Sequence, residues 1–431
     1  MKQLVINIHQ LVNVRSNNQL LRGPALADLP CLEKAYLEIE AGIIVGYGLM
    51  QELILSEADS YEKELGSSEK GSVSHKGESV SLIDAAGATV LPSWCDSHTH
   101  LVFAASRESE FVDKIKGLSY AEIAAKGGGI LNSAHKLNLC TEDELFNFAW
   151  ARLQEWMKLG TGGMEIKSGY GLSVAGELKM LRVIKRLKLV SPIPIKASFL
   201  AAHTYPIAYK EDHEGYISLI INEMLPIIEQ EGLADFIDVF CEEGFFSVEE
   251  TIRICAAGAA IGLRAKIHAN QLHLSGGVEA GIQLKALSVD HLETMDDSSI
   301  AALAASNTIG TLLPTAAYFL RMHFQPARAL IKAGAAIALA SDFNPGSSPS
   351  ANMNTVVSMA CIQLKMLPEE AINAATINGA FAMELENELG SISIGKRANL
   401  IFTKPIPSIA YLPYAFGSNL IERVMVSGKF L

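Results

Sequence analysis

Two histidines, His98 and His100, are separated by one residue at the end of an apolar run, in the segment PSWCDSHTH. In a β-strand such residues point to the same side, so both imidazoles can bind one metal ion. His268 and Asp342 lie at the ends of two later strand-like runs and complete a set of three histidines and one aspartate. Imidazole and carboxylate ligands suit Zn²⁺ or Fe²⁺ and leave a position for water. The set therefore predicts a metal site that can activate water.

Eight strand-like runs alternate with helical segments in the middle of the chain and must position these groups. The runs are LPSWCDSHTH, GTGGMEIKSGYG, PIKASFLAAH, ADFIDVFCEEG, AKIHANQL, ALSVDHLE, TIGTLLPT and AIALASDFNPG. Capping boxes at 141–144 and 247–250 mark the starts of two of the helices. The last four runs end 22 to 29 residues apart, which fits one strand and one helix per repeat. The pattern predicts an α/β fold, a (β/α)8 TIM-like barrel.

Six of the eight runs carry a chemically able side chain at or near their C-terminal end, which adds Lys167, His203 and His291 to the residues above. In a barrel these positions face one mouth, where active sites are built. A single histidine at such a place is more often structural, but five of the 11 histidines fall at this rim. Their joint placement predicts an active site there.

Residues 1–90 and 386–431 differ from the barrel segment, 91–385, because they are rich in short strand-like runs and glycine turns. AYLEIEAGIIVGYG indicates two strands about an Ala-Gly turn, and GSISIGKRANLIFTK and IERVMVSGKFL indicate further short strands. The polar stretch 60–79 indicates a surface excursion. We expect the two ends of the chain to form one small β-sandwich domain.

The composition limits the class of protein and its partners. The chain has 431 residues, 49% hydrophobic and 19% charged, with a net charge of −12. Such a chain buries a large core, and its acidity argues against nucleic-acid or anionic-membrane partners. No apolar run is long enough to span a bilayer, and the N-terminus makes a poor signal peptide. The six cysteines include no Cys-x-x-Cys pair, so we expect a reducing, cytoplasmic location.

The segment PSWCDSHTHLVF resembles the first barrel strand of the amidohydrolase superfamily of metal-dependent hydrolases, which share the barrel and the flanking β segments. Many members bridge two metals with a carboxylated lysine on the fourth strand. The corresponding run here, DFIDVFCEEGFF, contains no lysine. The resemblance therefore implies one divalent metal ion, Zn or Fe, with the ligands His98, His100, His268 and Asp342.

Further motifs resemble the imidazolonepropionase family, almost continuously from about residue 90 to 385. They are HTHLVFAASRESEF, EIKSGYGL, AAHTYP, DVFCEEGFF, KIHANQL, DHLE, TLLPTAAYFL and ASDFNPGSSP. That family opens the ring of 4-imidazolone-5-propanoate in histidine degradation and gives N-formimidoyl-L-glutamate. The resemblance implies hydrolysis of the cyclic amide C–N bond, with metal-bound water as the nucleophile.

The resemblance also implies roles for the catalytic groups. Asp342 accepts the proton of the water, and His291 polarises the carbonyl or carries a proton to the leaving nitrogen. For His291, a structural hydrogen bond within DHLE is the alternative. Gln271 stands where some family members have glutamate, and because an amide takes up no proton we expect it to orient the ring. Asp342 and His291 both remain candidates for the general base.

The substrate of that family carries a carboxylate, and Arg107 is its expected partner because a guanidinium forms two parallel hydrogen bonds with a carboxylate. An ion pair with Glu108 or Glu110 is the alternative. Tyr170 is the second expected contact, with a packing role as its alternative. His203 is expected to donate a hydrogen bond to the ring or the carboxylate, with a structural role as its alternative. The other expected substrate contacts are Tyr120, Asn344, Gly346 and Ser347.

Two other functions remain open. Another one-metal amidohydrolase, such as a purine or pyrimidine aminohydrolase, has less need of Arg107 and Tyr170. A metal-free binding protein on a decayed barrel is disfavoured because the ligand set is intact. Apart from a small carboxylate substrate, the expected partner is a second copy of the chain, since homodimers are the commonest assembly and the segment NMNTVVSMACIQLKM is apolar enough to pack across an interface.

Overall fold

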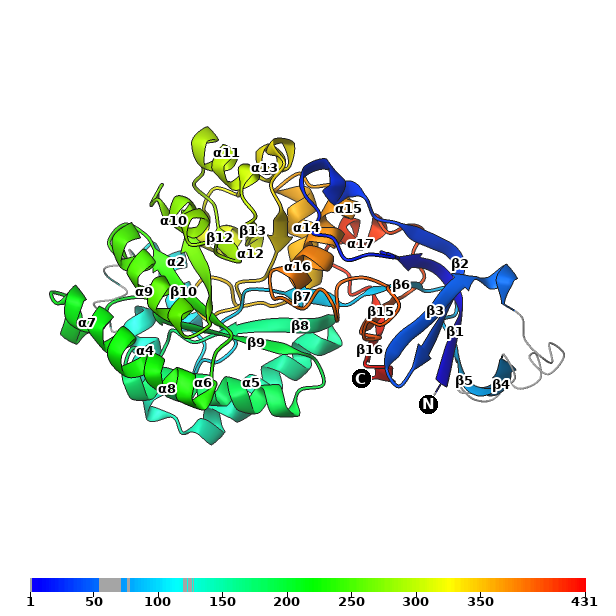
Figure 1. The fold of residues 1–431 in the computed structure, drawn as a ribbon, viewed down its shortest axis with the longest axis horizontal. Coiled ribbons are helices and arrows are strands. Elements are labelled where there is room, and N and C mark those ends of the chain that lie inside the picture. Colours follow the sequence, from blue (N-terminus) through cyan, green and yellow to red (C-terminus); the bar gives the residue numbers. More distant parts are fainter. Residues whose placement is uncertain (1, 54–70, 76–77, 119–121, 123–125, 127) are drawn as a thin grey trace.

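The computed structural model describes residues 2–53, 71–75, 78–118, 122, 126 and 128–431. Its centre is a sheet of eight parallel strands in the order β14-β13-β12-β11-β10-β9-β8-β7 (Figure 1). The strands are β7 (Trp94–Asp96), β8 (Thr161–Lys167), β9 (Ile195–Ala202), β10 (Phe236–Cys241), β11 (Arg264–Ala269), β12 (Ser288–His291), β13 (Ile309–Leu312) and β14 (Ile337–Leu339). Each predicted run contains one of them, and the predicted (β/α)8 fold is confirmed.

The first and last strands of the barrel meet through the residues that follow them. Thr99, after β7, forms a parallel bridge with Phe343, after β14. The backbone N–H of Asp342 donates to the carbonyl oxygen of His98 over 3.0 Å. This seam closes the barrel and places residues from its two chain ends side by side.

Helices surround the barrel sheet (Figure 1). Both predicted capping boxes are confirmed, since the side chains of Thr141 and Ser247 accept from the backbone N–H groups of Glu144 and Glu250 at 3.2 Å. These are the starts of α5 and α9. The helices of the barrel segment are α2 (Glu108–Ile115), α4 (Gly129–Leu139), α5 (Glu142–Lys158), α6 (Val174–Val190), α7 (His213–Leu219), α8 (Leu225–Glu231), α9 (Val248–Ala260), α10 (Gly277–Gln283), α11 (Asp297–Ala305), α12 (Pro314–Leu320), α13 (Ala327–Ala333), α14 (Met353–Ile362), α15 (Pro368–Ala375) and α16 (Ile377–Phe381).

Side chains alternate along the barrel strands between the core and the interior of the barrel. Ile237, Ile267 and Val289 belong to the main apolar core. Asp238 follows Ile237 and Asp290 follows Val289, and both carboxylates are buried as well. Because successive strand residues point to opposite sides, these carboxylates face into the barrel, where they contact side chains of other strands.

A second sheet, of nine strands, is built from both ends of the chain. Its main order is β17-β16-β15-β6-β1-β2-β3, with β5 pairing with both β1 and β4. The strands are β1 (Lys2–Val12), β2 (Cys31–Glu40), β3 (Ile43–Leu49), β4 (Gly71–His75), β5 (Glu78–Asp84), β6 (Thr89–Pro92), β15 (Leu400–Thr403), β16 (Ile421–Val426) and β17 (Lys429–Phe430). A separate β-rich domain formed from the two termini is therefore confirmed. The short helix α17 (Tyr411–Tyr414), between β15 and β16, packs against α14 of the barrel segment.

Two details of this sheet bear on the sequence predictions. The Ala-Gly turn between β2 and β3 is present, with left-handed φ angles of 51° at Ala41 and 84° at Gly42. The polar stretch 60–79 includes strand β4, which pairs with β5, and its position at the surface stays a prediction. Residues 54–70 and 76–77 lie outside the described residues, among which no helix is long and apolar enough to cross a membrane.

Candidate active site

A cavity of about 420 Å³ opens at the mouth of the barrel, beyond the C-terminal ends of the strands. The predicted metal-binding and catalytic residues that line it are His100, His268, His291 and Asp342. The predicted substrate contacts in its wall are Arg107, Tyr170, His203, Gln271, Asn344, Gly346 and Ser347. His98 is fully buried next to His100 and His268, and Tyr120 lies outside the described residues. One cavity thus contains residues from widely separated parts of the barrel segment of the sequence.

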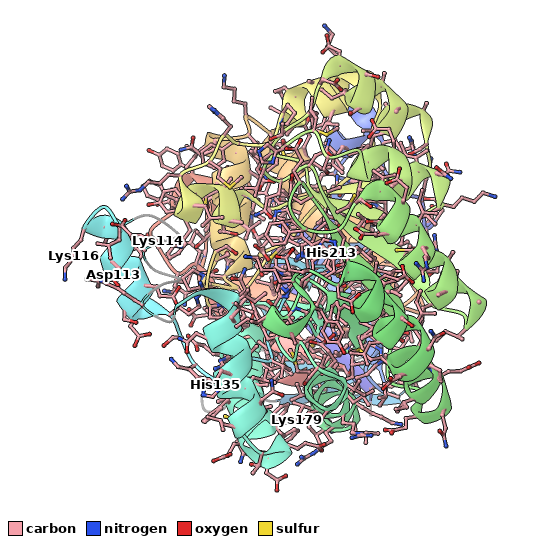
Figure 2. All side chains as sticks on the ribbon, turned by 90° about the vertical axis from the view of Figure 1, so that its left-hand side faces the viewer. Asp113, Lys114, Lys116, His135, Lys179 and His213 are labelled. Carbon is pink, nitrogen blue, oxygen red and sulfur yellow. The ribbon has the colours of Figure 1, made fainter. Side chains whose placement is uncertain are left out.

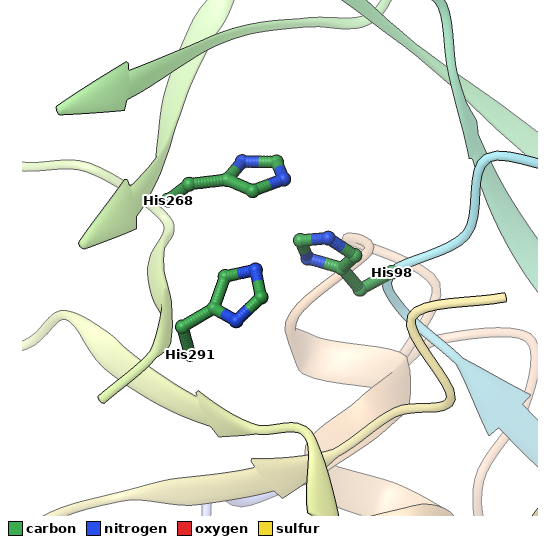
Figure 3. Close-up of side chains that lie close together, drawn as sticks. All are labelled: His98, His268 and His291. Carbon is green, nitrogen blue, oxygen red and sulfur yellow. The ribbon is translucent and has the colours of Figure 1, made fainter. Parts of the chain in front are cut away.

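The candidate metal ligands form two overlapping groups that share His98. Ligand atoms of His98, His100 and Asp342 lie within 4.8 Å of one another, and so do those of His98, His268 and His291. Oδ1 of Asp342 lies 3.5 Å from Nε2 of both His98 and His100. Figure 3 shows the rings of the second group converging from separate strand ends. The predicted four residues are therefore close together, and His291 lies beside them.

Two carboxylates hold His98 and His268 in the tautomer that a metal requires. Nδ1 of His98 lies 2.7 Å from Oδ2 of Asp290, and Nδ1 of His268 lies 3.1 Å from Oδ1 of Asp238. A carboxylate only accepts, so Nδ1 carries a proton, and in the neutral form of each ring Nε2 keeps its lone pair. Among the described residues these two buried Nε2 atoms have no hydrogen-bond partner. Burial lowers the pKa of His268, which keeps it neutral. The donor set therefore fits a divalent metal ion.

These two carboxylates belong to a buried network of charged side chains inside the barrel. The network consists of Glu165, Lys167, Asp238, Lys266 and Asp290, all buried. Nζ of Lys167 lies 2.6 Å from Glu165 and 2.8 Å from Asp238. The same atom lies 3.7 Å from Oδ2 of Asp290, and Lys266 forms an ion pair with Glu165. Burial alone would lower the pKa of Lys167, but Asp238 and Glu165 raise it above its ordinary value, so the ammonium group is charged.

The expectation that Lys167 faces the mouth is wrong. Its side chain is completely buried, and it is absent from the lining of the cavity among the described residues. Lys167 points to the same side of β8 as Glu165, into the barrel, where the carboxylates attract it. It links the carboxylates of Asp238 and Asp290, which orient two histidines.

Asp342 and His291 have left-handed backbone conformations, with φ angles of 51° and 87°. Such a conformation costs a non-glycine residue about 1–3 kcal/mol and is retained where the surroundings impose it, often at active sites. Nδ1 of His291 lies 3.4 Å from Glu293, which also accepts from Nε2 of Gln325 over 3.0 Å. The hydrogen bond within DHLE is thus present, while the ring still lines the cavity.

The turn after β14 orients the carboxylate of Asp342. Oδ1 of Asn344 accepts from the backbone N–H groups of Gly346 and Ser347, at 2.8 and 2.7 Å. Nδ2 of Asn344 donates to the backbone carbonyl oxygen of Asp342 over 2.7 Å. Oγ of Ser347 donates to Oδ2 of Asp342 over 3.3 Å. Burial opposes ionisation of Asp342, but the imidazoles of His100 and His98 hold its pKa well below the usual range. Asn344 and Ser347 therefore position Asp342, and both also line the cavity.

Tyr170 lies on a tight turn built around the buried carboxylate of Glu177, which accepts from the N–H groups of Gly169 and Gly171 at 2.9 and 2.7 Å. Gly169 has a φ of +108°, and a Cβ there would lie 2.9 Å from Nδ1 of His203. Nδ1 of His203 also lies 3.1 Å from the carbonyl oxygen of Gly169. This ring is neutral, because burial lowers the pKa of His203 to about 3. Its proton is therefore on Nδ1, so Nε2 offers an acceptor and not the expected donor.

Arg107 forms an ion pair with Glu110, whose Oε2 accepts from Nε over 2.8 Å and from Nη2 over 2.6 Å. The alternative considered for Arg107 is thus present, and the guanidinium lines the cavity as well. A Cβ on Gly346 would lie 2.4 Å from Nη1 of Arg107. Gly346 therefore leaves space for the guanidinium.

The loop that carries Gln271 is fixed by Glu242, at the end of β10. Oε2 of Glu242 accepts from the backbone N–H of Leu272 over 2.8 Å, and Oε1 lies 3.0 Å from Nδ1 of His273. These contacts hold the backbone on the C-terminal side of Gln271, so that its amide is presented to the cavity from a fixed loop.

Sequence reasoning missed Asp238, Asp290 and Lys114. The first two carried a usable signal, because an acidic residue interrupts the apolar runs FIDVF and SVDH. A charge buried in a strand needs partners, and the candidate histidines were the available ones. Lys114, which lines the cavity, follows Arg107 by seven residues in a polar helix and has no distinguishing pattern. Phe240 and Phe245 also line the cavity, and in the sequence they are indistinguishable from apolar residues of the core.

Comparison with known proteins places the chain in a family. Residues 236–431 match the amidohydrolase family. An imidazolonepropionase of Flavobacterium johnsoniae is 53% identical over 429 residues, which cover 99% of each chain. One of Christiangramia forsetii is 49% identical over 432 residues, with 100% of both chains covered. The chain belongs to the imidazolonepropionase family. Like the imidazolonepropionases it resembles, it is a hydrolase.

Solved structures show the same fold at low identity. A triazine hydrolase variant has a TM-score of 0.71 and 15% identity, covering 100% of this chain and 94% of that one. The guanine deaminase of E. coli has a TM-score of 0.68 and 13% identity, covering 100% and 99%. At these identities only the fold is shared. The amidohydrolase superfamily binds a metal, and in this imidazolonepropionase-family chain the His and Asp groups at the mouth fit one.

Proposed function

We propose that the chain hydrolyses the cyclic amide C–N bond of 4-imidazolone-5-propanoate to N-formimidoyl-L-glutamate, in histidine degradation. One observation carries this proposal. The cavity joins the histidines and Asp342 to a wall that contains the guanidinium of Arg107. A substrate with a polar ring and a carboxylate tail matches both parts, since metal ligands suit the reacting amide and a guanidinium suits the carboxylate.

His98, His100, His268 and Asp342 would hold one divalent ion, Zn²⁺ or Fe²⁺. When bound, such an ion supplies a Lewis acid that polarises the ring carbonyl and makes water nucleophilic near neutral pH. The carboxylate of Asp342 accepts the proton of the attacking water, because its low pKa keeps it ionised and Ser347 orients it. Nδ1 of His291 lies 3.4 Å from Glu293, and its ring lines the same cavity as Asp342. In this scheme His291 carries the proton taken up by Asp342 to the leaving ring nitrogen.

The remaining residues bind the substrate. Gln271 hydrogen-bonds the ring from its fixed loop, and the neutral His203 accepts a hydrogen bond from a ring N–H. Tyr170 closes the side of the cavity next to His100, with ring centroids 5.8 Å apart. Neither Gln271 nor His203 takes a proton in this scheme, which leaves the proton transfers to Asp342 and His291.

Replacing His291 by asparagine is expected to lower kcat about 100-fold or more while KM changes little. Asparagine can hydrogen-bond but cannot deliver a proton, and a positioned acid or base contributes roughly 10²–10⁴-fold. Steady-state kinetics across pH checks this, with His135→Asn as the control because His135 is exposed on α4 and is not among the residues that line the cavity. A kcat within threefold of the wild-type value removes His291 from the chemistry.

Replacing Arg107 by alanine is expected to raise KM about 10-fold or more and to leave the metal content unchanged. The guanidinium contributes charge-assisted hydrogen bonds to a carboxylate, and it does not touch the candidate ligands. KM and metal quantification on the same preparation test this. Arg186→Ala, at an exposed ion pair with Asp143, is the control. Unchanged kinetics would place Arg107 outside the binding site.

The test of the proposed function is a direct assay with freshly generated imidazolone propionate, together with metal quantification. Turnover of this compound, but not of guanine or cytosine, supports the proposal. Deamination of a purine or pyrimidine instead indicates an aminohydrolase. A protein without metal, whose activity and stability do not respond to chelation, would contradict hydrolysis at this site.

We also infer a reducing, cytoplasmic location, since the six cysteines are all free thiols. A homodimer is the assembly we propose. Ile362, Tyr414 and Phe416, around α14 and α17, are exposed apolar side chains of the kind that such an interface covers. Sedimentation of the purified protein decides between monomer and dimer.

A further inference from the structure

A second cation, Lys114, lines the cavity beside Arg107. It lies near the C-terminal end of α2, which begins immediately after Arg107. Its side chain is partly buried, and Nζ lies 3.4 Å from the carbonyl oxygen of Gly346. This contact is too long for a strong hydrogen bond, so most of the donor capacity of the ammonium group is left for another acceptor.

The guanidinium of Arg107 is only partly available to a ligand. Its Nε and Nη2 both donate to Oε2 of Glu110. Glu110 is held in place, because its other oxygen accepts from the backbone N–H of Gly129 over 3.0 Å. The edge that carries Nη1 remains, and it lies against Gly346, where a Cβ would come within 2.4 Å of it. Both N–H groups of Nη1 and the second N–H of Nη2 remain, so Arg107 keeps donors for a substrate carboxylate while Glu110 stays in place.

Lys114 and Arg107 thus both lie next to Gly346. The one carboxylate paired with them is that of Glu110, so this part of the wall carries an excess of positive charge. Burial and the charge of Arg107 both lower the pKa of Lys114, while Glu110 acts in the opposite direction. A bound anion next to both cations relieves this repulsion.

We propose that Lys114 is a specificity-determining residue, and that the carboxylate of the substrate bridges Nζ of Lys114 and Nη1 of Arg107 beside Gly346. The inference rests on the proposed function and deepens it. The selected ligand is a ring with a carboxylate tail, and an ester or amide of the same length is rejected because it leaves two cations without a counter-charge. Lys114 needs no movement of Glu110 to make this contact.

The test compares Lys114→Met with Lys116→Met. Methionine preserves the length and the apolar stem of lysine and removes the charge. Lys116 is exposed, follows α2 directly and is absent from the cavity lining, so it is a matched control on the same segment. Figure 2 shows both residues on the α2 segment at the edge of the molecule, with Lys116 at its outer end.

For imidazolone propionate, Lys114→Met is expected to raise KM about 10- to 100-fold, the range that one charge-assisted hydrogen bond contributes. The value of kcat should stay within about twofold, since the reacting bond is not touched. Metal content should not change. Lys116→Met should match the wild type in all three measurements.

A stable probe separates this inference from the proposed function. Binding of imidazole-4-propionate and of its methyl ester is measured by calorimetry on the metal-loaded protein. We expect Lys114→Met to weaken binding of the acid about 10-fold or more and to leave binding of the ester unchanged. Equal effects on acid and ester, or none on either, would overturn the role of Lys114. A role limited to packing against Phe319, whose ring centroid lies 6.0 Å from Nζ, would lower the melting temperature and spare the affinities.

The two failures are distinguishable. If the wild type does not turn over imidazolone propionate but binds the acid in a Lys114-dependent way, the proposed function fails and the carboxylate site stands. If turnover is normal and Lys114→Met changes neither KM nor acid binding, the function stands and Lys114 is excluded. A double variant, Lys114→Met with Arg107→Met, should lose less than the product of the single effects, because both cations contact one carboxylate.

Discussion

Replacing Asp342 by asparagine is expected to lower kcat for imidazolone propionate about 10³-fold or more. Oδ1 of Asp342 lies 3.5 Å from Nε2 of both His98 and His100, and Ser347 donates to Oδ2. Asparagine keeps the shape and loses two properties, the negative charge that a divalent ion requires and the ability to accept a proton. Because Asp342 supplies both properties, its replacement is expected to lower kcat more than the loss of a residue that acts only as an acid or base. Steady-state kinetics and metal quantification measure the two effects separately.

The control for this variant is Asp297→Asn, an exposed acid in the first turn of α11. It makes the same chemical change far from the cavity lining and should retain full activity. If Asp342→Asn keeps its metal and more than a tenth of the wild-type kcat, Asp342 is neither a required ligand nor the base. In that case the base would have to be His291.

Replacing Lys167 by methionine is expected to lower the free energy of unfolding by about 3–5 kcal/mol, the usual cost of removing one partner of a buried ion pair. The variant leaves three buried carboxylates with Lys266 as the one remaining lysine of the network. Asp238 and Asp290 lose the cation that fixes them, so His98 and His268 lose their orientation. Urea denaturation measures the first effect, and metal content after dialysis measures the second.

Lys196→Met, on the neighbouring strand β9 and in register with Glu165, controls for the loss of a lysine charge. Since Lys167→Met could fail to fold, Asp290→Asn provides a milder variant. It keeps a hydrogen-bonding side chain next to His98, and replacing such a partner typically weakens metal binding about 10- to 100-fold. Lys167 is a positioning residue only if the metal affinity falls in both variants, and an unchanged affinity in the folded Asp290→Asn protein would rule this out.

The barrel was predictable because its pattern is local. Each strand-like run is short, apolar and followed by a helix signal, and the capping boxes at Thr141 and Ser247 start helices where expected. The polar residues at the strand ends were informative for the same reason, since parallel strands bring their C-terminal ends together. The order of the strands is therefore enough to predict that residues at these ends lie close together.

What the sequence did not reveal depends on pairings between strands. The position of Lys167 at a strand end predicts that it lies near the mouth, but Asp238 and Asp290, on distant strands, attract its side chain into the barrel. The hydrogen bond of His203 to Gly169 likewise makes an acceptor of a residue expected to donate. The charge and the tautomer of a side chain depend on the residues around it in the fold. A sequence motif identifies the residue but not these neighbours.

The contact between the first and last strands of the barrel also has a consequence during synthesis of the protein. His98 and His100 leave the ribosome early, whereas their partner Asp342 and the bridging Phe343 come late. A nascent chain that stops before β14 lacks Asp342 and therefore one of the four proposed metal ligands. We therefore expect the proposed metal site to form only after the last strand of the barrel has been synthesised.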